Sequence, residues 1–370
     1  MKTVNGIYTS AKIFADTVEE YAVAQLQMLC NHKAFEGCKI RVMPDVHPGK
    51  VGTIGFTSTV GAQVLPNVIG IDIGCGITMA KLKQKKVEFQ KLDKVIREEV
   101  PSGFQIRNRE HRFAEEYDFS RLYCEKAINK QKARMSIGTL GGGNHFLELD
   151  KDEEGALYLV VHTGSRHLGK EVTEYYLNEG QKQLKQQGVD VPYELTYLQG
   201  TLMEEYLHDL QVVCEFADLN RQAILDTILK GMKWKSEEIY SVIHNYVGRD
   251  GIIRKGAISA HEGEKVIIPI NMRDGMILGH GIGNAEWNNS APHGSGRLMK
   301  RESVKEQYTV SQFKAVMKGI YCSCIGKETL DEAPFAYRGL KDIEEAIRET
   351  VVIEKIISPI YNFKAGEERR

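Results

Sequence analysis

The stretch Val68-Ile69-Gly70-Ile71-Asp72-Ile73-Gly74-Cys75-Gly76-Ile77-Thr78-Met79-Ala80 places a carboxylate and a thiol among apolar residues and glycines. The apolar run predicts a buried strand. A buried carboxylate at Asp72 is unfavourable unless it is paired or bound to a cation, and a thiolate at Cys75 has the same need. Two interpretations stay open for this stretch: a metal site with Asp72 and Cys75 as ligands, or a capped turn with an inert thiol.

The composition is that of an ordinary globular protein and narrows the classes of function. The chain has 370 residues, 42% of them hydrophobic and 27% charged, with a formal net charge of −1. Overall charge therefore does not predict a polyanion partner, and any contact with nucleic acid must come from a local patch. No apolar run approaches a membrane span, no signal peptide is evident, and seven cysteines are typical of reduced thiols. We expect a cytoplasmic protein.

Periodicity and breakers predict a mixture of helices and strands. Helices are expected at residues 17–30, 89–100 and 343–357 and over most of 171–232. Strands are expected at 39–43, 156–161, 240–246, 255–258 and 265–270, and the Pro- and Gly-containing residues 44–50 are expected to form a rigid loop. Candidate site residues extend from Asp45 to Lys364 without a linker or repeat, which favours one domain folded around one centre.

Three histidines supply further candidate ligands. The loop Gly138–Glu148 has three consecutive glycines that suit close approach to phosphate, and it continues into Asn144 and His145. His162 ends a predicted strand, whereas His244 lies inside one, where a lone histidine is more often a satisfied core residue. Together with Asp72 and Cys75, these three histidines are enough for two metal ions that share the thiolate. The donor types suit a first-row transition metal, and ligand type alone favours zinc over manganese.

Two more patches carry potential chemistry. Asp45 and His47 lie two residues apart and either face a site or form an Asx-type turn. His293 is followed by Gly294-Ser295-Gly296-Arg297, so its ring is sterically open and an arginine is near to pair with phosphate. Such a histidine is a general base, a ligand or a nucleophile, or it belongs to an incidental turn.

These patches occur in the order of the motifs of a known family, the RtcB RNA ligases, which the sequence resembles over nearly its whole length. The matching segments are 43–50 (MPDVHPGK), 70–76 (GIDIGCG), 141–146 (GGGNHF), 162–166 (HTGSR), 244–245 (HN), 293–297 (HGSGR) and 331–334 (DEAP). The resemblance implies an α+β fold: one large domain, residues 1–370, with mixed or antiparallel β-sheets surrounded by helices around a central dinuclear metal site.

The resemblance also implies an activity and the residues that carry it. The activity is GTP- and Mn²⁺-dependent ligation of RNA 3′-phosphate or 2′,3′-cyclic phosphate ends to 5′-hydroxyl ends. Cys75 would bridge two Mn²⁺ ions, with Asp72 and His145 on one ion and His162 and His244 on the other. His293 matches the histidine that becomes guanylylated, with His261 or Lys255 as the next candidates.

Further residues match positions that hold the substrates. The nucleotide would contact Asn144, His145, Phe146, Glu148, His244, Asn245, Gly294, Ser295, Gly296 and Lys364. Asp45 matches a carboxylate near the 5′-hydroxyl end, and Arg166 and Arg297 are further candidates for contacts to the RNA ends.

Departures from the family pattern predict a divergent branch associated with RNA repair rather than tRNA splicing, with a release-factor homologue as a possible partner in the same pathway. A Gly-Ser-Met stretch that contacts nucleotide in better-known members is replaced within residues 270–276, and an unusual Trp287-Asn288-Asn289-Ser290 precedes the histidine motif. Two alternatives remain: a non-catalytic relative that binds RNA or nucleotide, and a metallophosphoesterase.

Overall fold

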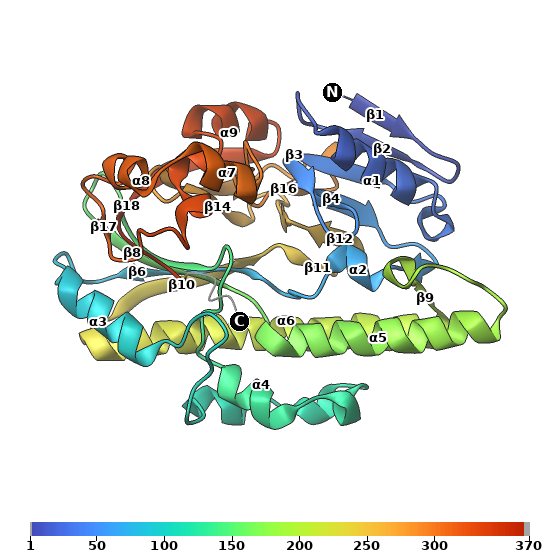
Figure 1. The fold of residues 1–370 in the computed structure, drawn as a ribbon, viewed down its shortest axis with the longest axis horizontal. Helices are drawn as coiled ribbons and strands as arrows, with labels where there is room; N and C mark the ends of the chain where they lie inside the picture. Colours follow the sequence, from blue (N-terminus) through green and yellow to red (C-terminus); the bar gives the residue numbers. More distant parts are fainter. Residues whose placement is uncertain (1, 366–370) are drawn as a thin grey trace.

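The computed structural model describes residues 2–365, whose strands form two main sheets (Figure 1). The first sheet has six strands in the order β1 (Lys2–Asn5), β2 (Ser10–Ile13), β3 (Ile40–Pro48), β4 (Thr53–Thr59), β12 (Ile252–Lys255) and β11 (Asn245–Val247). The second runs β10 (Ser236–Ile243), β6 (Gly76–Leu82), β8 (Leu157–Thr163), β7 (Phe146–Lys151), β18 (Val351–Lys364), β15 (Gly275–Gly281) and β14 (Lys265–Asn271), with β17 (Tyr321–Cys322) also on β18. Most neighbours are antiparallel, and the pairs β2–β3 and β17–β18 are parallel, so the predicted α+β class with mixed sheets is confirmed.

Two small ribbons and nine helices complete the described part of the chain. The ribbons are β13 (Ala257–Ser259) with β16 (Ser290–Pro292), and β5 (Gln63–Val64) with β9 (Leu198–Gln199). The helices are α1 (Glu20–Cys30), α2 (Pro66–Ile69), α3 (Phe89–Glu99), α4 (Lys130–Ser136), α5 (Arg166–Gln186), α6 (Gly200–Met232), α7 (Arg301–Gln307), α8 (Val310–Val316) and α9 (Leu340–Ile347). The long helix α6 lies along one side of the larger sheet, with α5 packed beside α6 and below α2, and α7, α8 and α9 lie on the other side (Figure 1). Within residues 2–365, no helix combines the length and the apolar character that crossing a membrane requires.

Strand β8 is buried along its whole length because both faces of the sheet are covered. Leu159 and Val161 pack with α6 residues such as Ile224, whereas Tyr158 and Val160 pack on the opposite face. Side chains alternate along a strand, so His162 shares the face of Val160, away from α6. This alternation directs His162 into the space between the two sheets.

Three predictions of local structure are wrong. The strand expected at 68–80 begins only at Gly76, because α2 holds Val68 and Ile69, and Gly70 and Gly74 have positive φ values of 87° and 67° that a strand cannot follow. The expected loop 44–50 is instead largely the end of β3, which tolerates its prolines because the pairing with β4 shifts register between Val42 and His47.

The third error lies near the C-terminal end of the described chain. The helix expected over 343–357 ends at Ile347, and residues from Val351 onward form β18. Most of the apolar residues in 351–357 are β-branched valine and isoleucine, which favour a strand, and the period of the apolar residues alone did not separate the two elements. Smaller differences concern boundaries: the first helix starts at Glu20, and residues 187–199 separate α5 from α6.

Candidate functional site

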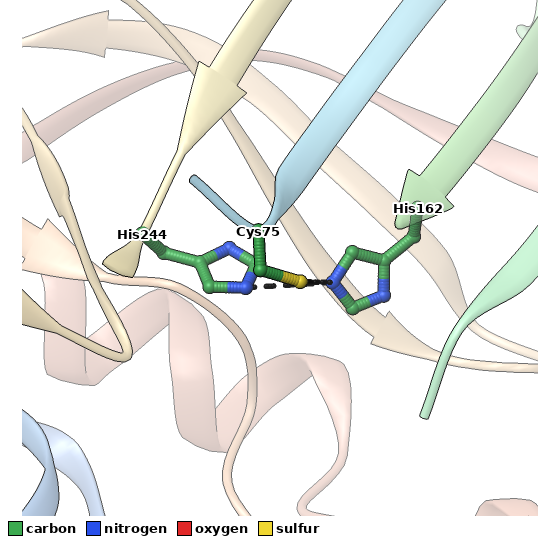
Figure 2. Close-up of side chains that lie close together, drawn as sticks. All are labelled: Cys75, His162 and His244. Atoms are coloured by element: carbon green, nitrogen blue, oxygen red, sulfur yellow. Dashed lines mark hydrogen bonds between the residues drawn. The ribbon is translucent and has the colours of Figure 1, made fainter. Parts of the chain in front are cut away.

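Strand register brings the predicted metal ligands together at the ends of three neighbouring strands of the larger sheet, β10, β6 and β8. Gly76, the first residue of β6, lies opposite Thr163 of β8 on one side and Ile243 of β10 on the other. Cys75 precedes Gly76, His162 precedes Thr163, and His244 follows Ile243. The three side chains therefore meet at this end of the strands, as Figure 2 shows. His145 joins them because it precedes Phe146, which pairs with His162.

The five side chains form two overlapping groups of donors. Cys75, His162 and His244 form one group, and Asp72, Cys75 and His145 form the other; within each group the donor atoms lie within 4.8 Å of one another. The Cys75 Sγ lies 3.5 Å from His145 Nε2 and 3.4 Å from His162 Nε2. His145 Nε2 is 3.1 Å from Asp72 Oδ2, and His162 Nε2 is 3.4 Å from His244 Nε2. The arrangement therefore offers two adjoining cation positions with the thiol between them.

Backbone carbonyls orient the histidine rings toward the thiol. The Nδ1 of His145 lies 2.9 Å from the Leu140 carbonyl oxygen, and the Nδ1 of His162 lies 3.1 Å from that of Asn144. A carbonyl can only accept, so each Nδ1 carries the proton and each Nε2 presents a lone pair. Gly164 is required beside them, because a Cβ there would lie 2.0 Å from Asp72 Oδ1.

Helix α6 holds the loops that carry these donors, a role that the sequence analysis missed. The fully buried Arg221 donates from Nη1 to the carbonyl oxygens of Gly74 and Thr163, at 2.8 and 2.9 Å. The neighbouring Asn220 accepts from the backbone N–H groups of Gly138 and Thr139. Their sequence signal was two adjacent polar residues on the buried side of a long helix.

The electrostatics of the donor groups suit a bound cation. Burial raises the pKa of the Cys75 thiol well above its usual range and lowers the pKa of His162 and of His244 well below theirs. Partial burial opposes ionisation of Asp72, but the adjacent His145 holds the pKa of this carboxyl below its usual range. Metal binding stabilises a thiolate and neutral imidazoles, and sulfur, nitrogen and oxygen donors together fit a first-row transition metal.

His293 lies directly beside this donor group. Its ring centroid is 4.8 Å from that of His244, and its Nδ1 is 2.7 Å from Oδ2 of the fully buried Asp45. Gly296 has a φ of 78°, and a Cβ there would lie 3.0 Å from Asp45 Cα, so the turn after His293 needs this glycine. Asp45 therefore neither forms a simple Asx turn nor lines the cavity, but holds His293.

The unusual stretch before His293 anchors its strand to the smaller sheet. Trp287 stacks on Phe14, with ring centroids 3.7 Å apart and planes 8° from parallel. Asn288 donates from Nδ2 to Thr57 Oγ1 at 3.0 Å. These contacts fix the start of β16, which ends one residue before His293.

A cavity of about 290 Å³ contains the donor groups and His293 and is lined by residues of both main sheets. Most residues predicted to hold nucleotide line it: Asn144, Phe146, Glu148, His244, Asn245, Gly294, Ser295, Gly296 and Lys364. The divergent stretch contributes Ile270, Asn271, Met272 and Gly275 to the same wall. His145 and Arg166 are not among the lining residues; Arg166 donates to Thr139 Oγ1 and to the Gly103 carbonyl oxygen.

One wall of the cavity is cationic and is held by a buried carboxylate. Glu332 accepts from Lys364 Nζ at 2.6 Å and from Tyr337 Oη at 2.7 Å, and it forms an ion pair with Arg301 Nη1 at 2.6 Å. Arg297 Nη1 lies 3.4 Å from the same carboxylate. These neighbours hold the pKa of Glu332 at about 2 against the effect of burial.

Sequence analysis assigned Arg301, Glu332 and Tyr337 no role, because only folding brings their segments together. Lys255, named only as an alternative nucleophile, lines the cavity, whereas the other alternative, His261, is not among the lining residues and pairs with Asp250 at 3.0 Å.

Comparisons with known proteins agree with this arrangement. A family model described as "tRNA-splicing ligase RtcB" matches residues 25–365. RNA-splicing ligase RtcB1 of Escherichia coli is 30% identical over an alignment of 360 residues, which covers 85% of this chain and 87% of the relative. RNA-splicing ligase RtcB of Escherichia coli K12 is 28% identical over 356 residues with the same two shares, 85% and 87%. The tRNA-splicing ligase RtcB of Pyrobaculum aerophilum is 26% identical over 413 residues, covering 85% of each chain. The chain therefore belongs to the RtcB family.

Proposed function

We propose that this chain is an RNA ligase of RNA repair or tRNA splicing that joins 3′-phosphate or 2′,3′-cyclic phosphate ends to 5′-hydroxyl ends. It uses GTP and Mn²⁺ and forms a covalent intermediate between His293 and GMP. Membership of the RtcB family supports RNA ligation. The observation that carries the chemistry is a histidine with one ring nitrogen fixed by a buried carboxylate, 4.8 Å from the ring of a candidate metal donor.

The donor groups suit two Mn²⁺ ions that share Cys75. Cys75, His162 and His244 would hold one ion, and Cys75, Asp72 and His145 the other. When bound, the ions offset negative charge on the phosphates of the substrates. The protein supplies the fixed ring orientations and excludes water from the edge of the sheet where the donors meet.

His293 performs the nucleophilic step with Asp45 as its positioning residue. The Nδ1–H of His293 donates a hydrogen bond to the Asp45 carboxylate, so Nε2 carries the lone pair. Nε2 attacks the α-phosphorus of GTP: an N–P bond forms, the P–O bond to pyrophosphate breaks, and pyrophosphate leaves.

Two transfers follow and regenerate the histidine. An oxygen of the RNA 3′-phosphate attacks the GMP phosphorus and the N–P bond breaks, which leaves the 3′-phosphate joined to GMP. The 5′-hydroxyl of the second RNA end then loses its proton, attacks that 3′-phosphate and displaces GMP. A 2′,3′-cyclic phosphate is first hydrolysed to a 3′-phosphate.

The cavity wall supplies the nucleotide contacts. Glu148 offers carboxyl oxygens that can accept from N–H groups of the guanine base, and Phe146, Asn144, Asn245 and residues 294–296 line the same cavity. Lys364, Arg297 and Arg301 place positive charge along one wall, which suits a nucleotide and the phosphates at the RNA ends. Arg297, which lines the cavity, is the proposed contact for those ends; Asp45 and Arg166 do not line it and stay predictions from the resemblance.

The reach of the cavity lining also supports one statement about the whole chain. Because residues from His47 to Lys364 line one cavity, we propose that residues 1–370 act as one domain. A cytoplasmic location and a release-factor homologue as pathway partner stay predictions.

Incubation with α-labelled GTP tests the proposal. The ligase predicts a covalent GMP adduct that is labile to acid and stable to alkali; a metallophosphoesterase or a non-catalytic binder predicts none. His293→Ala should abolish the adduct, whereas His208→Ala, at an exposed position on α6, should leave it unchanged.

A second substrate separates the nucleophile from the metal ligands. RNA whose 3′ end already carries GMP bypasses His293, so H293A should still seal it, whereas His162→Ala should impair both steps. An adduct that persists in H293A would refute the proposed nucleophile.

A further inference from the structure

Two thiols that the proposed chemistry does not use lie together next to the nucleotide cavity. Cys322, on β17, and Cys324 have their Sγ atoms 3.3 Å apart. Both side chains are partly exposed, whereas the other five cysteines of the chain are buried. An oxidant in solution therefore reaches this pair before it reaches the buried thiol Cys75.

The backbone around the pair already brings the two sulfur atoms close to bonding geometry. A disulfide has an S–S distance of about 2.05 Å, so the sulfurs must approach by roughly 1.3 Å. Cys322 is fixed because it pairs with Asn362 of β18, and the intervening Ser323 accepts at Oγ from Arg97 Nη2 at 2.7 Å. No long loop has to close, since a single residue separates the two cysteines.

Cys324 has the environment of a reactive thiol. The neighbouring Cys322 thiol and the backbone N–H of Lys364 lower the pKa of Cys324 against the effect of burial, and Lys364 and Arg97 add positive charge. The Lys364 N–H donates to Cys324 Sγ at 3.2 Å. A thiolate among cations is the form that attacks a peroxide.

The same contacts connect the pair to the cavity. Lys364 carries both the N–H that meets Cys324 and the Nζ that meets Glu332 in the cationic wall. Within the chain, Thr329 bridges the two sites: its Oγ1 donates to the Cys324 carbonyl oxygen at 2.6 Å, and its carbonyl oxygen accepts from Glu332 N–H at 3.0 Å. A displacement of the Cys324 sulfur would therefore act directly on the Lys364 N–H, and a shift of the Cys324 backbone would act on Glu332 through Thr329.

We propose that Cys322 and Cys324 form a reversible disulfide on reaction with a hydroperoxide, and that this disulfide weakens nucleotide binding in the adjoining cavity. The Cys324 sulfur attacks one peroxide oxygen; an S–O bond forms, the O–O bond breaks and an alcohol leaves. The Cys322 sulfur then loses its proton and attacks the Cys324 sulfur; the S–S bond forms, the S–O bond breaks and water leaves. The peroxide gains the two electrons that the thiols lose. Only the second half of the proposal rests on the proposed function.

Thiol counting after treatment with tert-butyl hydroperoxide tests the disulfide without reference to activity. We expect the wild-type chain to lose two of its seven thiols, its mass to fall by two hydrogens, and dithiothreitol to restore both. The single variants Cys322→Ser and Cys324→Ser should no longer show this reversible loss of two thiols, and C322S should trap a sulfenic acid at position 324. Cys38→Ser, a control outside the pair, should still form the disulfide.

GTP binding by the same samples tests the coupling. Oxidation should raise the Kd for GTP about tenfold in wild type, a change within the ordinary range of coupling between two sites. In the C322S/C324S double variant, oxidation should leave the Kd unchanged. By reciprocity, saturating GTP should disfavour the disulfide about tenfold in a thiol redox buffer, a shift of about 30 mV for a two-electron couple.

Three results would overturn the inference. Survival of all seven thiols in peroxide, or oxidation of Cys75 before the pair, would refute the proposed disulfide. An unchanged Kd in fully oxidised wild type would refute the proposed coupling. Reduced wild type that binds no GTP would instead refute the proposed nucleotide site, and the thiol count would still decide whether the disulfide forms.

Discussion

Replacing Asp45 by asparagine should slow guanylylation strongly without disturbing the fold. Asp45 is fully buried, its Oδ2 lies 2.7 Å from His293 Nδ1, and asparagine has nearly the same shape. The amide can donate an N–H to Nδ1, which moves the ring proton to Nε2 and removes the lone pair that attacks GTP.

The size of the effect follows from the lost bond and the changed tautomer. A hydrogen bond to a charged group contributes about 1.5–3 kcal/mol, which corresponds to about 10- to 150-fold in rate. Where a Ser-His-Asp enzyme suffers the same tautomer reversal by Asp→Asn, turnover falls about 10⁴-fold. We therefore expect D45N to lose between about 10² and 10⁴ in the rate of adduct formation.

Single-turnover labelling with α-labelled GTP measures this rate, and thermal unfolding checks the fold. Glu354→Gln is a matched control, because Glu354 pairs with Nδ1 of His280 at 2.9 Å on the surface and should leave the rate unchanged. Adduct formation by D45N within about threefold of wild type, well inside the range above, would refute the positioning role. Failure of D45N to seal RNA already activated with GMP would instead place Asp45 at the 5′-hydroxyl end.

Other consequences concern the metals and the buried acids. Cys75→Ala should abolish binding of both Mn²⁺ ions, whereas His145→Ala should weaken one; titration followed by electron paramagnetic resonance counts the ions, and two tight sites in C75A would exclude a bridging thiolate. Zn²⁺ binds nitrogen and sulfur donors more tightly than Mn²⁺ but prefers closed tetrahedral sites, so micromolar Zn²⁺ should suppress Mn²⁺-dependent ligation, and activation of metal-stripped enzyme by Zn²⁺ would contradict this. Burial raises the pKa of Glu148 to about 8 and that of Asp150 well above its usual range, so the folded chain keeps protons that the unfolded chain releases above about pH 4. The contribution of these two carboxyls to stability should therefore be fullest below that pH and fall as the pH rises toward 8, and Asp150→Asn should show a smaller drop in melting temperature than wild type between about pH 5 and 8; equal drops would contradict this.

The sequence was informative where a residue's local surroundings determine its role. Cys75 and His162 stood out as candidates because Cys75 lies between two glycines and His162 follows an apolar run two residues before Gly164. His244 could not be assigned from periodicity, because it occupies a one-residue break between β10 and β11 that looks like continuous strand. It entered the candidate set only as one more histidine, and the family resemblance supplied its pairing with His162 on one ion.

Contacts between distant segments could not be predicted from local sequence patterns. Asp45 and His293 are 248 positions apart, and the residues around each of them do not indicate that the two side chains form a hydrogen bond. Glu332 likewise holds the cationic wall only because folding places Lys364 and Arg301, from separate elements, next to its carboxylate. Such pairings follow from the packing of whole sheets, which no single window of residues encodes.

The position of β18 has a consequence for how the protein reaches its native state. This strand lies between β7, at residues 146–151, and β15, at residues 275–281, so it joins partners that are separated by more than a hundred residues along the chain. Phe146 and Glu148 on β7 and Ile270 on β14 line opposite parts of the same cavity. Pairings of such long range slow folding, because chain entropy is lost before the contacts compensate for it. Until residues 351–364 insert, β7 and β15 have no strand to hold them together, and a chain arrested at that stage exposes two unpaired strand edges that favour aggregation.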